Sequence, residues 1–120
     1  IPVIANGDIF TVDNYHACKL ASGCEHVMLG RGAVSVPDLA KQIINEQHIP
    51  LEWVQILTLL MKYLDHLLQV TEQKYAVARF KQWLNYLAKA FPDAQQSFEH
   101  VKRFKLAQPM RQYFEALTNV

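Results

Sequence analysis

The sequence predicts a mainly α-helical protein: a C-terminal helical bundle preceded by the last βαβ piece of a (β/α)8 TIM barrel. Two short apolar runs of strand composition, Ile1–Ala5 and His26–Leu29, are separated by one helix-length segment, which is typical of parallel strands. After residue 50, apolar residues recur at steps of three and four, the period of a helix. Because two parallel strands cannot cover their own faces, we expect the chain to be the C-terminal part of a larger α/β protein.

Local signals set the ends of the first elements. Thr11 or Asp13 can cap a helix that extends to about Ala21, and Gly23 supplies the left-handed turn that ends it. Pro37 suits the first turn of a short helix that extends to about residue 46. We expect a domain boundary there, with one domain over residues 1–45 and the other over 46–120. The second domain should hold four helices, at about residues 50–70, 74–90, 94–103 and 109–117.

Charge is divided unevenly along the chain. Residues 1–70 carry four Lys and Arg against seven Asp and Glu, a net charge of −3, whereas residues 71–120 carry eight against four, a net charge of +4. A basic C-terminal half favours a polyanionic partner, although ordinary solvated helix faces would give the same balance.

Composition excludes several classes of protein. The longest apolar stretch, residues 54–68, contains Lys62, Asp65 and His66, so we expect no membrane span. Cys18 and Cys24 are too few for a disulfide framework, which fits a reduced, cytoplasmic setting. The five histidines are scattered without a ligand-like pair, so we expect no metal site.

A glycine-containing polar turn follows each predicted strand. These turns are Asn6-Gly7-Asp8 and Gly30-Arg31-Gly32. Because parallel strands place both turns at one edge of the sheet, their backbone N–H groups can converge on one phosphate, to which Arg31 would add a charged contact. The alternatives are that Asp8 merely caps its turn and that Arg31 forms a salt bridge.

The predicted helix 74–90 presents two different faces. Val77, Phe80, Leu84 and Leu87 lie on the face that we expect in the core. The opposite face carries a stripe of Arg79, Gln82, Tyr86 and Lys89, flanked by Lys81 and extended by Lys102, Arg103 and Lys105. Cations, an amide and an aromatic on one face suit nucleic acid, while a solubilising surface is the alternative.

Three segments resemble the tRNA-dihydrouridine synthases. Ile1–Ile9 and Ser22–Ala33 look like the last two barrel strands of that family, and Tyr75–Leu87 resembles the bacterial subfamily C. The departures are small: Asp8, where the acid of the family varies, and Glu25 and His26, where Asp with Gly or Ala is commoner after the cysteine.

The resemblance implies a flavoenzyme that reduces the C5–C6 double bond of a uridine in the tRNA D-loop, at the position called 16. It implies FMN, held by the first domain at Asn6, Gly7, Asp8, Gly30 and Arg31, and NADPH as the reductant. The helical domain would bind tRNA through Arg79, Lys81, Gln82, Tyr86 and Lys89. The catalytic cysteine of the family matches neither Cys18 nor Cys24, so we expect it upstream and this segment alone to be inactive.

Two other classes of function stay open from the sequence. One is a different FMN-dependent TIM-barrel oxidoreductase that acts on a small metabolite, and the other is a helical interaction module without a nucleic-acid role. We expect the full-length enzyme to be a monomer. In this segment alone, residues 1–35 would be disordered, pack onto the bundle in a non-barrel arrangement, or pair with another copy through unprotected strand edges.

Overall fold

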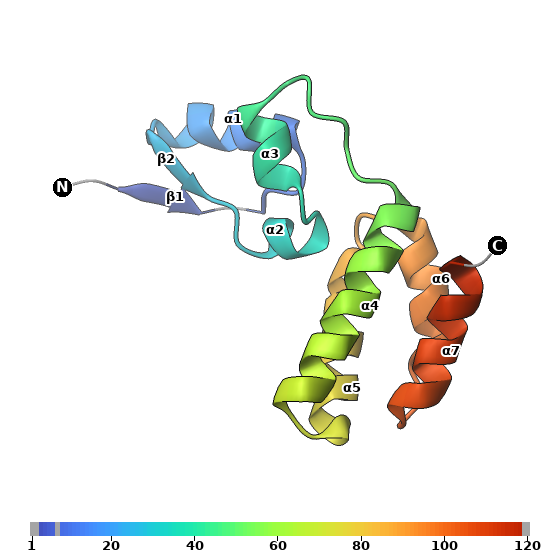
Figure 1. Cartoon of the computed structure of the whole chain (residues 1–120). Coiled ribbons are helices and arrows are strands. Elements are labelled where there is room, and N and C mark those ends of the chain that lie inside the picture. The colour runs from blue at the N-terminus through green and yellow to red at the C-terminus, as the bar shows by residue number, and fades with distance from the viewer. Residues whose placement is uncertain (1–2, 7, 119–120) are drawn as a thin grey trace. The chain divides into compact units, whose positions relative to one another are not determined.

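The structure, a computed structural model, describes residues 3–6 and 8–118, with Asn6 described by its backbone alone. It is mainly helical, which confirms the predicted class (Figure 1). The chain divides into two compact units, Ile1–Pro50 and Leu51–Val120.

The first unit begins with a parallel pair of strands. β1 (Ile4–Asn6) lies beside β2 (His26–Met28), with Ile4 opposite His26 and Asn6 opposite Met28. α1 (Val12–Ser22) connects them and contacts both strands. The Thr11 hydroxyl accepts a hydrogen bond from the Asn14 N–H at 3.0 Å, and Gly23 ends the helix at a φ of 69°. Thr11 is therefore the N-cap, one of the two residues that we considered.

Two short helices complete this unit, and one of them corrects a prediction. Residues 30–33, expected as a turn, lead instead into α2 (Arg31–Ser35), which is followed by α3 (Leu39–Ile44). The sequence of α2 includes a glycine, a β-branched residue and a serine, all poor helix formers, so propensity does not reveal it. Burial of Gly32 and Ser35 and contact with α3 hold the turn in helical form.

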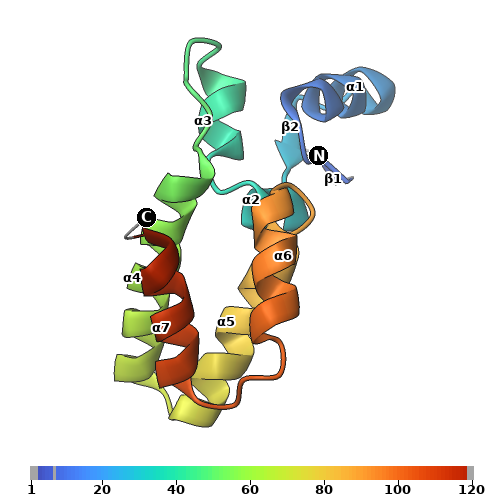
Figure 2. The same ribbon diagram turned by 90° about the vertical axis from the view of Figure 1, so that its right-hand side faces the viewer.

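The second unit consists of four helices that run alternately up and down (Figures 1 and 2). α5 packs against the other three, and α4 also packs against α7. Their apolar faces form one continuous core, in which Phe80 and Phe114 meet edge to face with ring centroids 5.4 Å apart. The helices are α4 (Trp53–Val70), α5 (Gln73–Leu87), α6 (Pro92–Val101) and α7 (Ala107–Thr118).

Side chains at the helix ends explain where the bounds differ from the predicted ones. α4 begins at Trp53 because the Gln55 side chain accepts a hydrogen bond from the Glu52 N–H at 2.8 Å. α6 begins at Pro92, a favourable first helical position because proline has no N–H to leave unsatisfied. The Ala107 N–H, at the start of α7, donates to the side-chain oxygen of Gln73 at 2.9 Å.

An ion-pair network ties α4 to α7. The guanidinium of Arg111 bonds the carboxylate of Asp65 and, at 2.9 Å, that of Glu115. The hydrogen bond from Arg111 holds the pKa of Asp65 below its usual range. Because the Asp65 side chain is 47% exposed, water screens the pair, and the apolar core stabilises the unit far more than this pair does.

Candidate phosphate turns and nucleic-acid interface

The structure brings the two turns that follow β1 and β2 together. Parallel pairing puts both turns at the carboxyl edge of the sheet. Arg31 Nη2 donates to Asp8 Oδ1 at 2.8 Å, linking the two turns across the edge. The salt bridge considered as an alternative role for Arg31 is therefore present. It does not occupy the whole guanidinium, because this group has five N–H donors.

Gly32 lies against the backbone of Ile9, the residue that follows the first turn. A Cβ added at this glycine would lie 1.5 Å from the carbonyl oxygen of Ile9, which is closer than any two such atoms can come. Ile9 itself is buried, with 1% of its surface exposed. Glycine is therefore required at this position by backbone packing, a reason distinct from the φ of 53° that favours glycine at Gly30.

Not every residue of the predicted phosphate site can be placed. Gly7 and the side chain of Asn6 lie outside the described residues. Asp8, Gly30 and Arg31 are exposed, with the Asp8 side chain 70% and that of Arg31 61% accessible to water. The described part of the site is thus an open edge whose one cation is balanced by one carboxylate.

The basic stripe on α5 faces away from the core. Arg79 and Gln82 are exposed and Tyr86 is half-buried, while Phe80 and Leu84 on the opposite face are completely buried. Lys89 departs from the prediction, because α5 ends at Leu87 and Lys89 lies in the turn that follows. Lys89 is exposed near the stripe but does not continue its helical register.

Lys81 has a structural role that the sequence did not indicate. Its ammonium group donates to the backbone carbonyl of Lys102 at 2.9 Å and to that of Phe104. Partial burial and, secondly, the charge of Lys105 lower the pKa of Lys81. Lys81 thereby joins α5 to the end of α6, and its ammonium is turned toward these carbonyls rather than outward.

The cations expected to extend the stripe have different surroundings. Lys102 pairs with Glu99 at 2.6 Å, so its charge is compensated. Arg103 and Lys105 are exposed, and the part of the chain that the structure describes records no ion pair for either. The uncompensated positive charge therefore lies at Arg79, Arg103 and Lys105 more than at Lys81 or Lys102.

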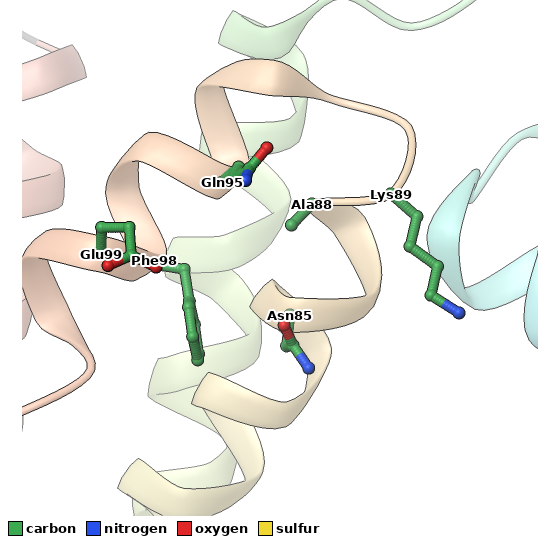
Figure 3. A pocket seen from close by; sticks show the side chains of 6 residues that line it. All are labelled: Asn85, Ala88, Lys89, Gln95, Phe98 and Glu99. Carbon is green, nitrogen blue, oxygen red and sulfur yellow. The ribbon is translucent and has the colours of Figure 1, made fainter.

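A pocket of about 270 Å³ lies between the C-terminal end of α5 and α6 (Figure 3). Figure 3 shows Ala88 and Lys89 in the turn that follows α5 and Phe98 on α6, with the Lys89 side chain extending away from the other five. The remaining lining residues, Asn85, Gln95 and Glu99, are polar. None of these three was singled out from the sequence, because the contact joins two helices whose pairing the sequence does not reveal.

Neither a metal-binding cluster nor a membrane-spanning helix occurs among the residues that the structure describes. No group of three His, Cys, Asp or Glu side chains could hold a metal ion there. Within the same residues, every helix is too short or too polar to cross a membrane.

Comparison with known proteins decides the family. The sequence model described as Dihydrouridine synthase (Dus) matches residues 1–119, nearly the whole chain. The chain belongs to the dihydrouridine synthase family. The resemblance seen in the three sequence segments is thereby confirmed.

Relatives within the family carry a more specific name. The chain is 38% identical over 119 residues to the tRNA-dihydrouridine(16) synthase of Pasteurella multocida, covering 99% of this chain and 38% of that protein. It is 43% identical over 103 residues to the enzyme of the same name from Escherichia coli O157:H7, covering 85% of this chain and 32% of that protein. The protein of that name from Pseudomonas putida is 39% identical over 107 residues, 86% of this chain and 33% of its own length. The chain thus spans about a third of the length of these relatives.

Proposed function

We propose that this chain is the C-terminal part of a tRNA-dihydrouridine synthase that reduces the C5–C6 double bond of the D-loop uridine at position 16. The observation that carries the proposal is the family match over residues 1–119, together with relatives named for that position. Because the chain spans only about a third of these relatives, the activity belongs to the whole protein. Each of the two units would contribute a different part of that activity.

The first unit would complete a (β/α)8 barrel. Val3, just before β1, and Ile4, in β1, are 64% and 62% exposed, and Met28 in β2 is 55% exposed. Parallel strands are normally covered on both faces, so these apolar side chains need further structure against them. The remaining strands and helices of a barrel would supply that cover, and residues 1–45 would then be its C-terminal part.

The two turns at the edge of this unit would hold the phosphate of FMN. The fit rests on two features: Gly30 precedes α2 at a positive φ, and Gly32 lets the second turn come against the backbone of Ile9. Asp8 would orient Arg31, whose remaining N–H groups would then donate to a phosphate oxygen. Asn6 and Gly7 are proposed as further contacts of the same cofactor. FMN, reduced by NADPH, would supply the reducing equivalents.

Replacing Arg31 with Ala is expected to weaken FMN binding by the intact enzyme at least tenfold. A hydrogen bond to a charged group contributes about 1.5–3 kcal/mol, and the substitution removes one such donor. Flavin fluorescence titration measures the affinity, and Lys41→Ala, another exposed cation of the same unit, is the control. Unchanged FMN affinity with impaired tRNA binding would remove Arg31 from the cofactor site.

The second unit would bind tRNA through the stripe of Arg79, Gln82 and Tyr86, with Lys89 beyond it. Arginine and lysine bond phosphates, tyrosine stacks on bases, and glutamine bonds a base or a sugar. Lys81 is proposed to act in a different way, by holding α5 against the end of α6. This division of roles also separates the proposal from its alternatives, since neither a small-metabolite oxidoreductase nor a protein-interaction module needs a salt-dependent RNA surface.

The parent chain is expected to bind tRNA with an affinity that falls as salt rises, and Arg79→Ala is expected to flatten that dependence. Each phosphate contact contributes slightly less than one unit to the slope of log affinity against log salt, so one contact should be lost. Filter binding over a series of salt concentrations measures both quantities. Lys62→Ala, an exposed cation on α4, is the matched control and should leave the slope unchanged. If the parent shows no salt-dependent tRNA binding, the proposed role of this unit is wrong.

A further inference from the structure

A second pocket in the helical unit is cationic around its rim and apolar at its base. It has a volume of about 710 Å³ and lies where the link between α6 and α7 runs beside the first half of α5. Figure 2 shows this link next to the first turn of α5. The pocket is lined by Lys74, Val77, Ala78, Lys81, Phe104 and Lys105.

The α5 residues of the pocket share one face of the helix. Lys74, Ala78 and Lys81 follow one another at steps of four and three, which places them in a row. Val77, which is 4% exposed, belongs to the core and forms part of the base of the pocket. This face adjoins the stripe at Gln82, so a ligand lying along the stripe could reach the pocket without crossing the core.

The aromatic side of the pocket is held in position from α5. The hydrogen bonds from Lys81 to the carbonyls of Lys102 and Phe104 fix the link that carries the Phe104 ring. Phe104 is half-buried and packs against the core on one side. The structure therefore supplies a fixed aromatic surface, rather than a mobile one, as one wall of the pocket.

Charge indicates the kind of ligand. No acidic side chain lines the pocket. Lys74 and Lys105 are exposed and, among the residues that the structure describes, neither has a recorded ion pair. Burial and, secondly, the charge of Lys105 lower the pKa of Lys81, so Lys105 lies close enough to Lys81 for their charges to interact. A ligand that complements this pocket carries a negative group for the lysines and a flat apolar group for the Phe104 ring.

We propose that this pocket holds one unstacked nucleotide of a single-stranded RNA segment, with its base against Phe104 and its phosphates bonded by Lys74 and Lys105. Base stacking on an aromatic side chain with cations along the backbone is the general way in which single strands are bound. The inference rests on the proposed tRNA binding and deepens it: the helical unit would recognise an unpaired nucleotide as well as a phosphate backbone. A volume of about 710 Å³ is of the size that small-molecule sites have.

The test compares a single-stranded ten-residue oligouridylate, an RNA duplex and whole tRNA, each titrated into the 120-residue chain. Phe104→Leu keeps an apolar side chain but removes the flat ring, and we expect about a tenfold loss of affinity for the single strand with little change for the duplex. Lys74→Ala combined with Lys105→Ala should lower the salt slope for the single strand by roughly 1.4, or about 0.7 per phosphate. These two lysines are exposed, so the double variant tests the pocket even if Phe104→Leu destabilises the fold.

Controls separate the failure of this inference from the failure of the proposed function. If the lysine variants bind the single strand like the parent while Arg79→Ala weakens tRNA binding, the pocket proposal is wrong and the tRNA surface stands. A parent chain that binds neither tRNA nor oligouridylate overturns both. Equal competition by a polyglutamate peptide of the same charge would show a general site for acidic peptides, and would also overturn the assignment to a nucleotide.

Discussion

Replacing Phe80 with Ala is expected to destabilise the helical unit by about 3–5 kcal/mol, which is enough to unfold a marginal domain. Phe80 is completely buried, and its ring packs edge to face against Phe114 of α7 at a centroid distance of 5.4 Å. Its loss therefore leaves a cavity at the contact between α5 and α7. Chemical denaturation followed by tryptophan fluorescence measures the effect, because Trp53 and Trp83 both lie in this unit.

The matched control lies on the same helix. Tyr75 is an aromatic residue of α5 whose surface is 55% exposed, so Tyr75→Ala should change the free energy of unfolding by no more than about 0.5 kcal/mol. The rings of Trp83 and Tyr63 meet edge to face with their centroids 4.9 Å apart, so the fluorescence of Trp83 reports directly on packing between α4 and α5. Equal denaturation midpoints for Phe80→Ala and Tyr75→Ala would mean that α5 does not bury the face seen in the structure.

Replacing Gly32 with Ala is expected to destabilise the first unit by about 3 kcal/mol and to separate the two turns. The added Cβ would lie 1.5 Å from the Ile9 carbonyl oxygen and 2.7 Å from its carbonyl carbon, so the backbone itself must move. Overpacking that shifts the backbone costs about 1–3 kcal/mol, and contact between two backbones lies at the upper end of that range. Hydrogen exchange of the backbone N–H groups in β1, α2 and β2 measures the loss.

Gly23 offers a control that isolates the steric effect. A Cβ there meets nothing within 4 Å, but the φ of 69° is unfavourable for alanine. Gly23→Ala should therefore cost about 1 kcal/mol through the backbone alone. If the two glycine variants lose the same protection from hydrogen exchange, then the need for glycine at position 32 comes from its conformational freedom and not from close packing. In the intact enzyme, Gly32→Ala should also lower FMN affinity, since the proposed phosphate site needs both turns in place.

Much of this protein was determined by its sequence alone. The steps of three and four from Val54 to Leu68 predicted the helix that is α4. Thr11 or Asp13 marked the start of α1 and Gly23 its end, because caps and apolar periodicity act within a few residues of chain. The two glycine turns and the segment Tyr75–Leu87 carried the family resemblance, which the match over residues 1–119 confirmed. The opposite faces of α5 also followed from the helical period, with Phe80 inside and Arg79 outside.

Only the tertiary structure decided what the charged side chains do. Arg31 pairs with Asp8, 23 residues away in the chain, and Lys81 bonds the carbonyls of Lys102 and Phe104, about as far away. Neither partner could be read from local spacing, because hydrogen bonds between elements depend on how those elements pack. For the same reason the sequence did not predict α2, whose poor helix formers are held in helical form by burial. Nor did it predict the pocket formed by Lys74, Phe104 and Lys105. Local sequence sets which face of a helix is polar, and packing decides which of its cations stay available to a ligand.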